Sequence, residues 1–215
     1  QLAIDLKLYY FQEKAGQRFL YRQFLDKVLE KEPQTEYLIS YLINDIEQSI
    51  LDVAKAHNVK VFTYNSPFTA SLESRVGRPR EGSNQHWIGH LYSDEISVGY
   101  DLANYIINEK KKDKQTINLL AINGKNNTAL SKMREKGLID RVNEDKLINL
   151  LQVINTDWSY KDARNKTKLL LKRFSEIDVI WCSSDTIARA VVDEINSTNP
   201  ALLNKVKIGG IDWSE

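Results

Sequence analysis

The sequence predicts an α/β fold with parallel sheets, built as two similar halves. Short apolar runs alternate with longer segments whose apolar residues recur at helical spacing, which is typical of parallel strands joined by crossover helices. The alternation is interrupted over residues 66–84 and resumes after Asp94. We therefore expect one half in residues 1–93 and the other in residues 94–215.

The first half opens with a predicted strand at residues 2–10, where apolar and polar side chains alternate. A helix is expected over residues 14–31, and Pro33 ends it because proline has no N–H to continue the helical ladder. Asn44 or Asp45 is placed to cap the next helix. The remaining strands of this half are predicted at residues 37–43, 59–64 and 85–92.

Residues 66–84 show no apolar period and are expected to form a long loop. A loop of this length in a compact domain is usually a lid, a binding loop or a mobile segment. Two interpretations stay open, namely a solvated excursion and a loop that faces a ligand or partner. Its turn-forming and basic residues are Pro67, Gly77, Pro79 and Gly82, and Arg75, Arg78 and Arg80.

The second half opens at Ser93-Asp94-Glu95, a sequence that caps a helix. Each apolar run that follows is short enough for a buried strand and leads through a polar turn into a helical pattern. Strands are predicted at residues 117–122, 147–154, 178–182 and 206–211. Helices are predicted at about 95–110, about 128–143, around Ala163 to Leu171, and at 187–195.

Composition excludes several classes of function. The net charge is +1, so no overall field favours nucleic acid or an anionic membrane. The basic run at residues 109–114 is short and lies at a predicted helix end, where a solvated terminus is expected. No apolar run is long enough to cross a bilayer. The single cysteine, Cys182, falls within a predicted strand and is expected to be a buried, inert thiol.

Catalytic and metal-binding patterns are weak. His86 and His90 share a face of one predicted strand, but no third ligand stands at metal-binding spacing. The turn at residues 123–125 lacks the Lys-Ser/Thr ending of a phosphate-binding loop. We expect no catalytic residues, no metal and no cofactor.

Two acidic residues follow neighbouring predicted strands of the second half. Asp185 comes shortly after residues 178–182, and Asp212 directly follows residues 206–211. In open parallel sheets, ligands bind at the carboxyl ends of the strands. Paired carboxylates at this edge suit a polyhydroxylated ligand, because an ionised carboxylate accepts strong hydrogen bonds from hydroxyl groups.

Four short motifs, taken in order, resemble the type I periplasmic binding proteins. The ribose- and galactose-binding members of this family share their fold with the core of LacI-type repressors. The resemblance implies two Rossmann-like lobes with parallel sheets, joined by a hinge. The motifs are Asp94-Glu-Ile-Ser-Val-Gly99, Thr156-Asp-Trp-Ser159, Ser183-Ser-Asp-Thr-Ile-Ala188 and Ile208-Gly-Gly-Ile-Asp-Trp213.

The resemblance also implies that the chain is partial at both ends. Residues 1–93 correspond to an N-lobe without the family's first strand, and residues 94–215 to a C-lobe without its C-terminal elements. On this interpretation, parts of both lobes and of the hinge lie outside the sequence.

The resemblance assigns ligand contacts to residues at strand ends in both lobes. In the N-lobe, Asn65 and Ser66 stand where sugar-binding relatives carry an acidic and a basic residue, and a turn role for Asn65 is equally open. Trp158 matches an aromatic residue that stacks on the sugar ring. A core or surface role for Trp158 is the alternative.

Like Trp158, the remaining site residues lie in the C-lobe. Asp185 and Asp212 are the strongest candidates, although Asp185 is also well placed as a helix N-cap. Ser184 replaces the family's usual asparagine, which shortens one polar contact. Lys132 falls near a family arginine, with a solvated helix face as the alternative. Two further assignments are Trp213, which lines the cleft or packs on the sheet edge, and Asp94, which caps a helix at the hinge.

The resemblance implies binding without catalysis. The expected function is that of a periplasmic substrate-binding protein, which captures a small sugar or sugar-like ligand between two lobes for a membrane ABC permease or a sensor. The alternative is the effector-binding core of a LacI-type transcription regulator, which needs a helix-turn-helix before Gln1. An enzyme on a doubly wound sheet is a third, weaker hypothesis, because fold alone does not fix function. No nucleic-acid contact is expected within this segment.

Overall fold

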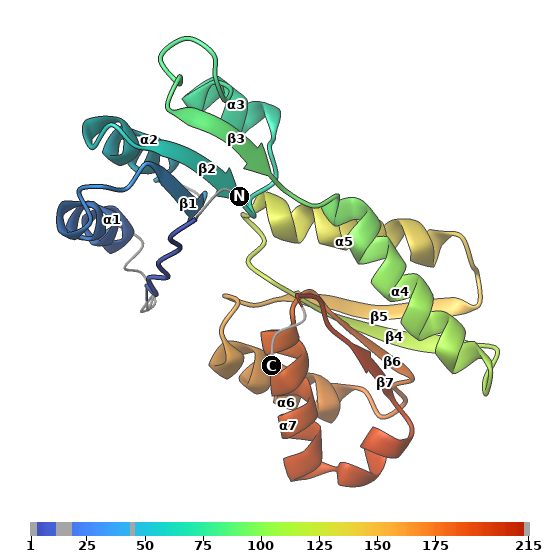
Figure 1. The fold of residues 1–215 in the computed structure, drawn as a ribbon. Coiled ribbons are helices and arrows are strands. Elements are labelled where there is room, and N and C mark those ends of the chain that lie inside the picture. The colour runs from blue at the N-terminus through green and yellow to red at the C-terminus, as the bar shows by residue number, and fades with distance from the viewer. Residues whose placement is uncertain (1–3, 12–18, 44–45, 213–215) are drawn as a thin grey trace. The chain divides into compact units, whose positions relative to one another are not determined.

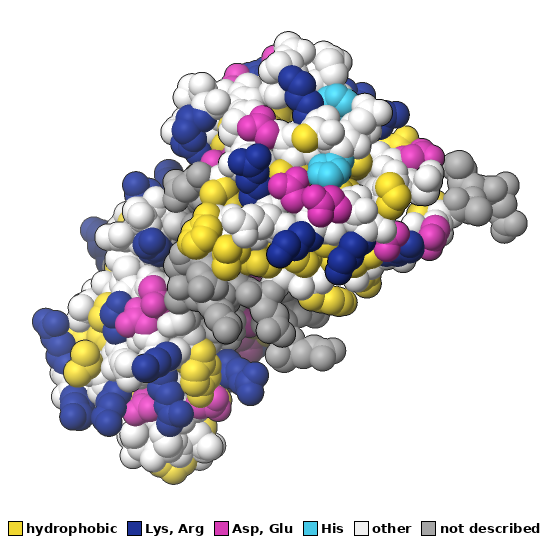
Figure 2. Space-filling view, turned by 90° about the vertical axis from the view of Figure 1, so that its left-hand side faces the viewer, with side chains coloured by type: hydrophobic (Ala, Val, Ile, Leu, Met, Phe, Trp, Pro, Cys, Tyr) yellow, Lys and Arg dark blue, Asp and Glu magenta, His cyan; other side chains and the backbone are white. Residues whose placement is uncertain are grey.

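The computed structural model describes residues 4–11, 19–43 and 46–212, and it divides into two compact units, residues 1–93 and 94–215 (Figure 1). Both units are built from parallel strands and covering helices, so the predicted α/β fold class is confirmed. Basic and acidic side chains are interspersed on the surface that Figure 2 shows. None of the described helices combines the length and the apolar character needed to cross a bilayer.

Unit 1, residues 1–93, holds a parallel sheet with the strand order β1-β2-β3. One cluster of its core joins α1 to α2 through Leu25, Leu29, Ile50 and Val53. The strands are β1 (Tyr37–Tyr41), β2 (Lys60–Tyr64) and β3 (Trp87–Leu91). The helices are α1 (Leu20–Lys31), α2 (Glu47–Ala56) and α3 (Ala70–Val76).

The strand predicted at residues 2–10 is wrong for the part that the structure describes. Residues 4–11 form neither helix nor strand, and the alternating side chains of Ile4, Leu6 and Leu8 are exposed. A strand needs a hydrogen-bonded neighbour as well as a pattern, and β1 is paired only with β2 among the described strands. Instead, the segment is held to the end of α1 by Lys7 and Tyr9, which both donate to the Glu32 carboxylate.

The long loop predicted at residues 66–84 contains a short helix, α3, that the sequence pattern did not reveal. Thr69 caps it by accepting from the Leu72 amide at 3.2 Å, and Leu72 and Val76 are buried one turn apart. Gly77 ends it with a φ of 73°. The arginines of this region contact groups of unit 1: Arg75 the Glu47 carboxylate, Arg78 that of Glu73, and Arg80 the Ile88 carbonyl.

Unit 2, residues 94–215, holds a parallel sheet with the order β5-β4-β6-β7. Helices α4 and α5 cover one face and α6 and α7 the other (Figure 1). The strands are β4 (Ile117–Asn123), β5 (Ile148–Asn155), β6 (Val179–Cys182) and β7 (Lys207–Gly209). The helices are α4 (Glu95–Lys111), α5 (Ala129–Asn143), α6 (Tyr160–Arg173) and α7 (Asp185–Thr198), followed by the 3-10 helix η1 (Pro200–Asn204).

Two local predictions for unit 2 are confirmed. The Asp94 side chain caps α4 by accepting from the Ile96 and Ser97 amides at 3.1 and 3.2 Å. Cys182 is fully buried in β6, and burial raises the pKa of its thiol, so the thiol stays protonated and inert.

The caps predicted at Asn44 or Asp45, and the first part of the helix predicted at residues 14–31, lie outside the described residues.

Candidate ligand-binding site

The carboxyl edge of the unit 2 sheet brings together residues that the sequence placed at strand ends. Asp185 begins α7 just after β6, and Asp212 follows β7, which is the neighbour of β6. The two segments touch, because the Asp185 amide donates to the Ile211 carbonyl at 2.7 Å. This edge is where ligands bind in open parallel sheets.

Arg134, on α5, holds the Asp212 carboxylate in place. Its Nη2 donates to Asp212 Oδ1 at 3.1 Å, while its other nitrogens donate to Glu95 and to the Ser183 carbonyl, each at 2.6 Å. The Arg134 side chain is 6% exposed and that of Asp212 is 47% exposed. The ion pair therefore runs from a buried cation to a carboxylate that solvent or a ligand can reach.

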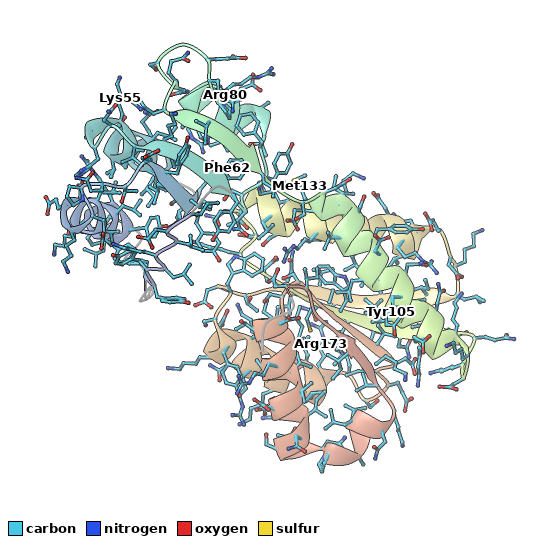
Figure 3. The ribbon with its side chains drawn as sticks, viewed as in Figure 1. Lys55, Phe62, Arg80, Tyr105, Met133 and Arg173 are labelled. Atoms are coloured by element: carbon cyan, nitrogen blue, oxygen red, sulfur yellow. The ribbon has the colours of Figure 1, made fainter. Side chains whose placement is uncertain are left out.

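Sequence reasoning missed Arg134 and chose Lys132 instead. Lys132 is exposed on the same helix, beside Met133, which is labelled on α5 in Figure 3. Residues two apart on a helix point about 200° apart, so the two cations face opposite ways. A signal was present, since Arg134 lies three and four residues before Gly137 and Leu138 on the buried stripe of α5.

Trp158 follows β5 and is braced against the end of β4. Its amide donates to Thr156 Oγ1 at 3.2 Å, and that hydroxyl donates to the Asn123 carbonyl at 2.8 Å. The indole lies on Gly124, where a Cβ atom would stand only 2.1 Å from Trp158 Cζ2. Trp158 is half-buried, so a large aromatic surface is fixed at the carboxyl edge of the sheet.

Backbone strain concentrates on the predicted contact residues. Asn65, Trp158 and Asp212 have φ angles of 87°, 73° and 105°, in the left-handed region that non-glycine residues rarely adopt. Among the described residues, only Asn58 and Arg80 share this property outside glycine. Such strain persists where the surroundings enforce it, and it gathers at ligand sites.

Two buried polar atoms of unit 2 also lie at this edge without a partner. Asn155 ends β5 and Ser183 follows β6, and neither Asn155 Oδ1 nor Ser183 Oγ makes a hydrogen bond within the described structure. Buried polar atoms are nearly always paired, so an unpaired one calls for an explanation. A binding site, where groups are satisfied only in the liganded state or by water, supplies one.

Ser184, rather than Asp185, caps helix α7. The Ser184 hydroxyl accepts from the Ile187 amide at 3.3 Å, and Asp185 is the first residue of the helix. The N-cap interpretation of Asp185 is therefore wrong. Its carboxylate in the first turn still favours the helix through the macrodipole. Trp213 lies outside the described residues.

In unit 1, the strand-end candidates are held by uncharged groups. Asn65 is exposed just after β2, whereas the buried Ser66 hydroxyl donates to the Leu42 carbonyl. His90 Nε2 lies 2.8 Å from the Ser66 carbonyl oxygen, and His90 Nδ1 lies 2.8 Å from Thr63 Oγ1. Because a carbonyl only accepts, Nε2 carries the proton and Nδ1 accepts from Thr63.

Burial lowers the pKa of His90, although its hydrogen bonds with Ser66 and Thr63 act in the opposite direction. The imidazole is therefore neutral at pH 7, in agreement with an Nδ1 atom that accepts from Thr63. The network continues to Trp87, whose Nε1 donates to Thr63 Oγ1 at 2.7 Å. It fixes the backbone at Ser66, directly beside Asn65.

Two tyrosines at the carboxyl edge of the unit 1 sheet were not singled out from the sequence. Tyr41 ends β1 and Tyr64 ends β2, and their ring centroids lie 4.5 Å apart. Burial, helped by Tyr41, raises the pKa of Tyr64 to about 12, so its hydroxyl remains a donor at pH 7. The sequence did contain a signal for them, because each tyrosine is the last residue of its strand and the two strands are neighbours.

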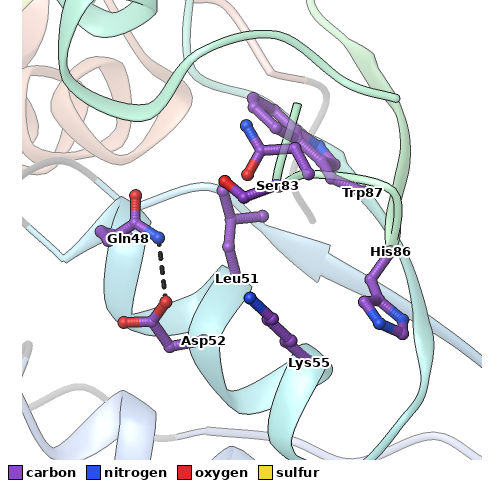
Figure 4. A pocket seen from close by; sticks show the side chains of 8 residues that line it. Gln48, Leu51, Asp52, Lys55, Ser83, His86 and Trp87 are labelled. Carbon is purple, nitrogen blue, oxygen red and sulfur yellow. Dashed lines mark hydrogen bonds between the residues drawn. The ribbon is translucent and has the colours of Figure 1, made fainter. Parts of the chain in front are cut away.

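Two cavities, one in each unit, lie away from these strand ends. In unit 1, a cavity of ≈ 30 Å³ is lined by polar residues such as Gln48, Asp52 and His86, and it lies beside the start of β3 (Figure 4). In unit 2, a cavity of ≈ 370 Å³ is lined by the C-terminal ends of α6 and α7, including Phe174 and Thr198. Helices after parallel strands run back to the amino edge, so this cavity is at the opposite edge from Asp185 and Asp212.

Comparison with known proteins identifies the class of protein. Residues 44–215 match the family described as the periplasmic binding protein domain, and the chain belongs to this family. The predicted resemblance to the type I periplasmic binding proteins is thus confirmed. No curated protein sequence matches the chain.

Solved structures share the fold at low sequence identity. A periplasmic sugar-binding protein from Pseudomonas fluorescens is 22% identical, with a TM-score of 0.68 over 90% of this chain and 56% of its own. An ABC transporter periplasmic solute-binding protein from Actinobacillus succinogenes, with bound D-allose, is 17% identical, with a TM-score of 0.72 over 89% and 63%. A carbohydrate transporter solute-binding protein from Agrobacterium radiobacter, in complex with D-arabinose, is 16% identical, with a TM-score of 0.63 over 89% and 60%. The chain thus spans less than two thirds of the length of these proteins.

Proposed function

We propose that this protein is a periplasmic solute-binding protein that captures a small sugar or sugar-like ligand and presents it to an ABC permease or a sensor. The observation that carries the proposal is the carboxyl edge of the unit 2 sheet. There the Asp212 carboxylate is held by Arg134 and half-exposed, and the Trp158 indole is fixed over Gly124. The D-allose and D-arabinose seen in two similar structures support a sugar as the ligand class.

The chemistry of these groups matches a sugar. A carboxylate accepts hydrogen bonds from ring hydroxyls, and charge-assisted bonds of this kind are the strong ones. An indole face covers the apolar face of a pyranose or furanose ring and leaves its hydroxyls free to bond elsewhere. Asp185, in the adjacent segment, adds a second carboxylate. Binding requires no reaction step, and we assign none to these residues.

The proposal is tested on the full-length mature protein by thermal-shift screening followed by calorimetry. The panel contains D-allose, D-arabinose, D-ribose and D-fucose, with acidic amino acids as non-sugar controls. A ligand that binds only the folded protein stabilises it by about 2.7 kcal/mol at a concentration of a hundred times Kd. The melting temperature rises accordingly. A selective rise with a sugar is expected. Binding of the amino acids in place of all sugars would contradict the proposal.

A further inference from the structure

We propose that the ≈ 370 Å³ cavity of unit 2 is a second binding site, which takes a small carboxylic acid with an apolar body. The cavity is lined by the C-terminal ends of α6 and α7 and by η1, at the amino edge of the sheet, and the proposed sugar site lies at the carboxyl edge. Its volume is at the small end of ligand pockets, which measure about 300–1,000 Å³. Because no residue of the cavity is assigned a sugar contact, the two sites can be tested separately.

One part of the cavity wall is apolar. Leu171, Phe174 and Leu202 line it, and all three are half-buried side chains that pack against the core cluster of α6 and α7. Phe174 follows α6 in an extended conformation, and its amide donates to the Leu170 carbonyl at 2.9 Å, so its backbone is fixed at the helix end. An apolar ring or chain placed against this wall is removed from water, which is favourable in proportion to the area buried.

Two lysines supply positive charge to the cavity. Lys168 and Lys172 stand four residues apart on α6, so their side chains leave the helix on one face. Both are exposed, and neither forms an ion pair within the described part of the chain, whereas Lys166 of the same helix pairs with Asp162. Like charges at this spacing repel each other, so a carboxylate bound between them relieves the repulsion.

The buried carboxylate of Glu194 also lines the cavity, but it does not cancel this charge. Its Oε2 accepts from Arg164 Nε at 2.8 Å, and its side chain is 7% exposed. Arg164 therefore compensates Glu194, and the lysines set the charge that a ligand meets. Arg173, labelled in Figure 3, adds a further cation, since its guanidinium carbon lies 5.2 Å from the centre of the Phe174 ring.

The helix ends at the cavity offer little to a cationic ligand. The last carbonyls of a helix carry partial negative charge and attract cations. Here, however, the Glu194 carbonyl accepts from Ser197 Oγ at 2.9 Å and from Thr198 Oγ1 at 2.7 Å. The Leu170 and Ile195 carbonyls accept from backbone amides. Because these carbonyls already have donors, we expect the lysines to decide the sign of the ligand.

The test is calorimetry on the full-length mature protein with three compounds of similar shape. Phenylacetate carries a carboxylate, phenylacetamide a neutral amide, and phenethylamine an ammonium group on the same ring. We expect phenylacetate to bind, and the other two to bind at least about tenfold more weakly, because charge-assisted hydrogen bonds to a carboxylate are the strong ones. Equal or tighter binding of the amide or the amine would overturn the proposal, as would a failure of phenylacetate to bind.

Variants test which cations hold the acid. Replacing both lysines, Lys168→Gln with Lys172→Gln, is expected to raise the Kd for phenylacetate about tenfold or more. Both side chains are exposed, so the fold should persist. The matched control is Lys161→Gln, which changes an exposed lysine in the first turn of α6, away from the cavity, and should leave Kd unchanged. An equal loss in the control, or no loss in the double variant, would overturn the assignment of the lysines.

NMR on the wild-type protein locates the acid without any substitution. Backbone amide shifts on addition of phenylacetate are expected to centre on Phe174, Thr198 and Leu202, which line the cavity. Shifts centred instead on the carboxyl strand ends, at Trp158 and Asp212, would overturn the proposal, because the acid would then occupy the site proposed for the sugar.

Discussion

The carboxyl edges of the two sheets carry different kinds of side chain. In unit 1, the groups beside Asn65 are uncharged and satisfied by each other, from Trp87 through Thr63 and His90 to the Ser66 carbonyl. In unit 2, a buried cation reaches an exposed carboxylate, and Ser183 Oγ has no hydrogen-bond partner among the described residues. The strand ends of unit 1 therefore carry a fixed backbone and aromatic rings, whereas those of unit 2 carry charged side chains. We expect most of the specificity for hydroxyl groups to come from unit 2.

The largest expected effect on affinity is from Asp212→Ala. A hydrogen bond to a charged group contributes about 1.5–3 kcal/mol, so Kd for the bound sugar should rise by about tenfold to a hundredfold or more in calorimetry. The control is Asp140→Ala on α5, whose side chain is 45% exposed and pairs with Lys136. This control variant should bind the sugar with the affinity of the wild type. An equal loss of affinity in both variants would contradict the role of the Asp212 carboxylate as a ligand contact.

Gly124→Ala is expected to weaken binding by about tenfold by displacing the Trp158 indole. The new Cβ would overlap Trp158 Cζ2, so the indole must leave its position at the sheet edge. A shift in the tryptophan emission spectrum should accompany the loss of affinity. Unchanged emission and unchanged Kd would show that the position of Trp158 does not matter for binding.

Ser66→Ala tests whether Ser66 in unit 1 supports the fold or contacts the ligand. Its hydroxyl donates to the buried Leu42 carbonyl, and loss of one partner costs about 1–3 kcal/mol of unfolding free energy. The melting temperature should fall, while Kd should change less than about threefold. A large loss of affinity with no loss of stability would instead support the direct ligand contact that the sequence predicted for Ser66.

The smallest effect is a pH dependence from His90. Burial lowers its pKa in the folded state, so the unfolded chain, with an ordinary pKa near 6.5, binds more protons between the two values. Stability is therefore complete above about pH 6.5 and declines as the pH falls through that value toward the folded-state pKa. Denaturant unfolding of wild type and His90→Gln at several pH values should show a shallower decline in the variant. An identical dependence of unfolding free energy on pH in the wild type and in His90→Gln would contradict a neutral His90 in the folded protein.

The order of strands and helices could be predicted because each apolar run and helical stripe is local in the sequence. Asp185 and Asp212 could be placed at one edge for the same reason, since each follows a strand directly. Helix α3 was missed because it is short and buries only Leu72 and Val76. The predicted strand at residues 2–10 failed because an alternating pattern does not supply a pairing partner.

The role of Arg134 could not be predicted from the sequence alone, although its place on the buried stripe of α5 could. Its role depends on the crossing of α4 and α5 at Gly99 and Gly137, which brings Glu95 within 2.6 Å across 39 positions of sequence. Ion pairs of this kind are tertiary, and no local period encodes them. The strained backbone of Trp158 and Asp212 is likewise visible only in three dimensions.

The most direct test of the central claim is to locate the sugar by NMR on the full-length mature protein. Chemical-shift changes on addition of D-allose or D-arabinose would be mapped over unit 2. We predict that they centre on Trp158, Asp185 and Asp212. Changes centred instead on the ≈ 370 Å³ cavity beside Phe174 and Thr198, with none at the carboxyl strand ends, would contradict the assignment of the site.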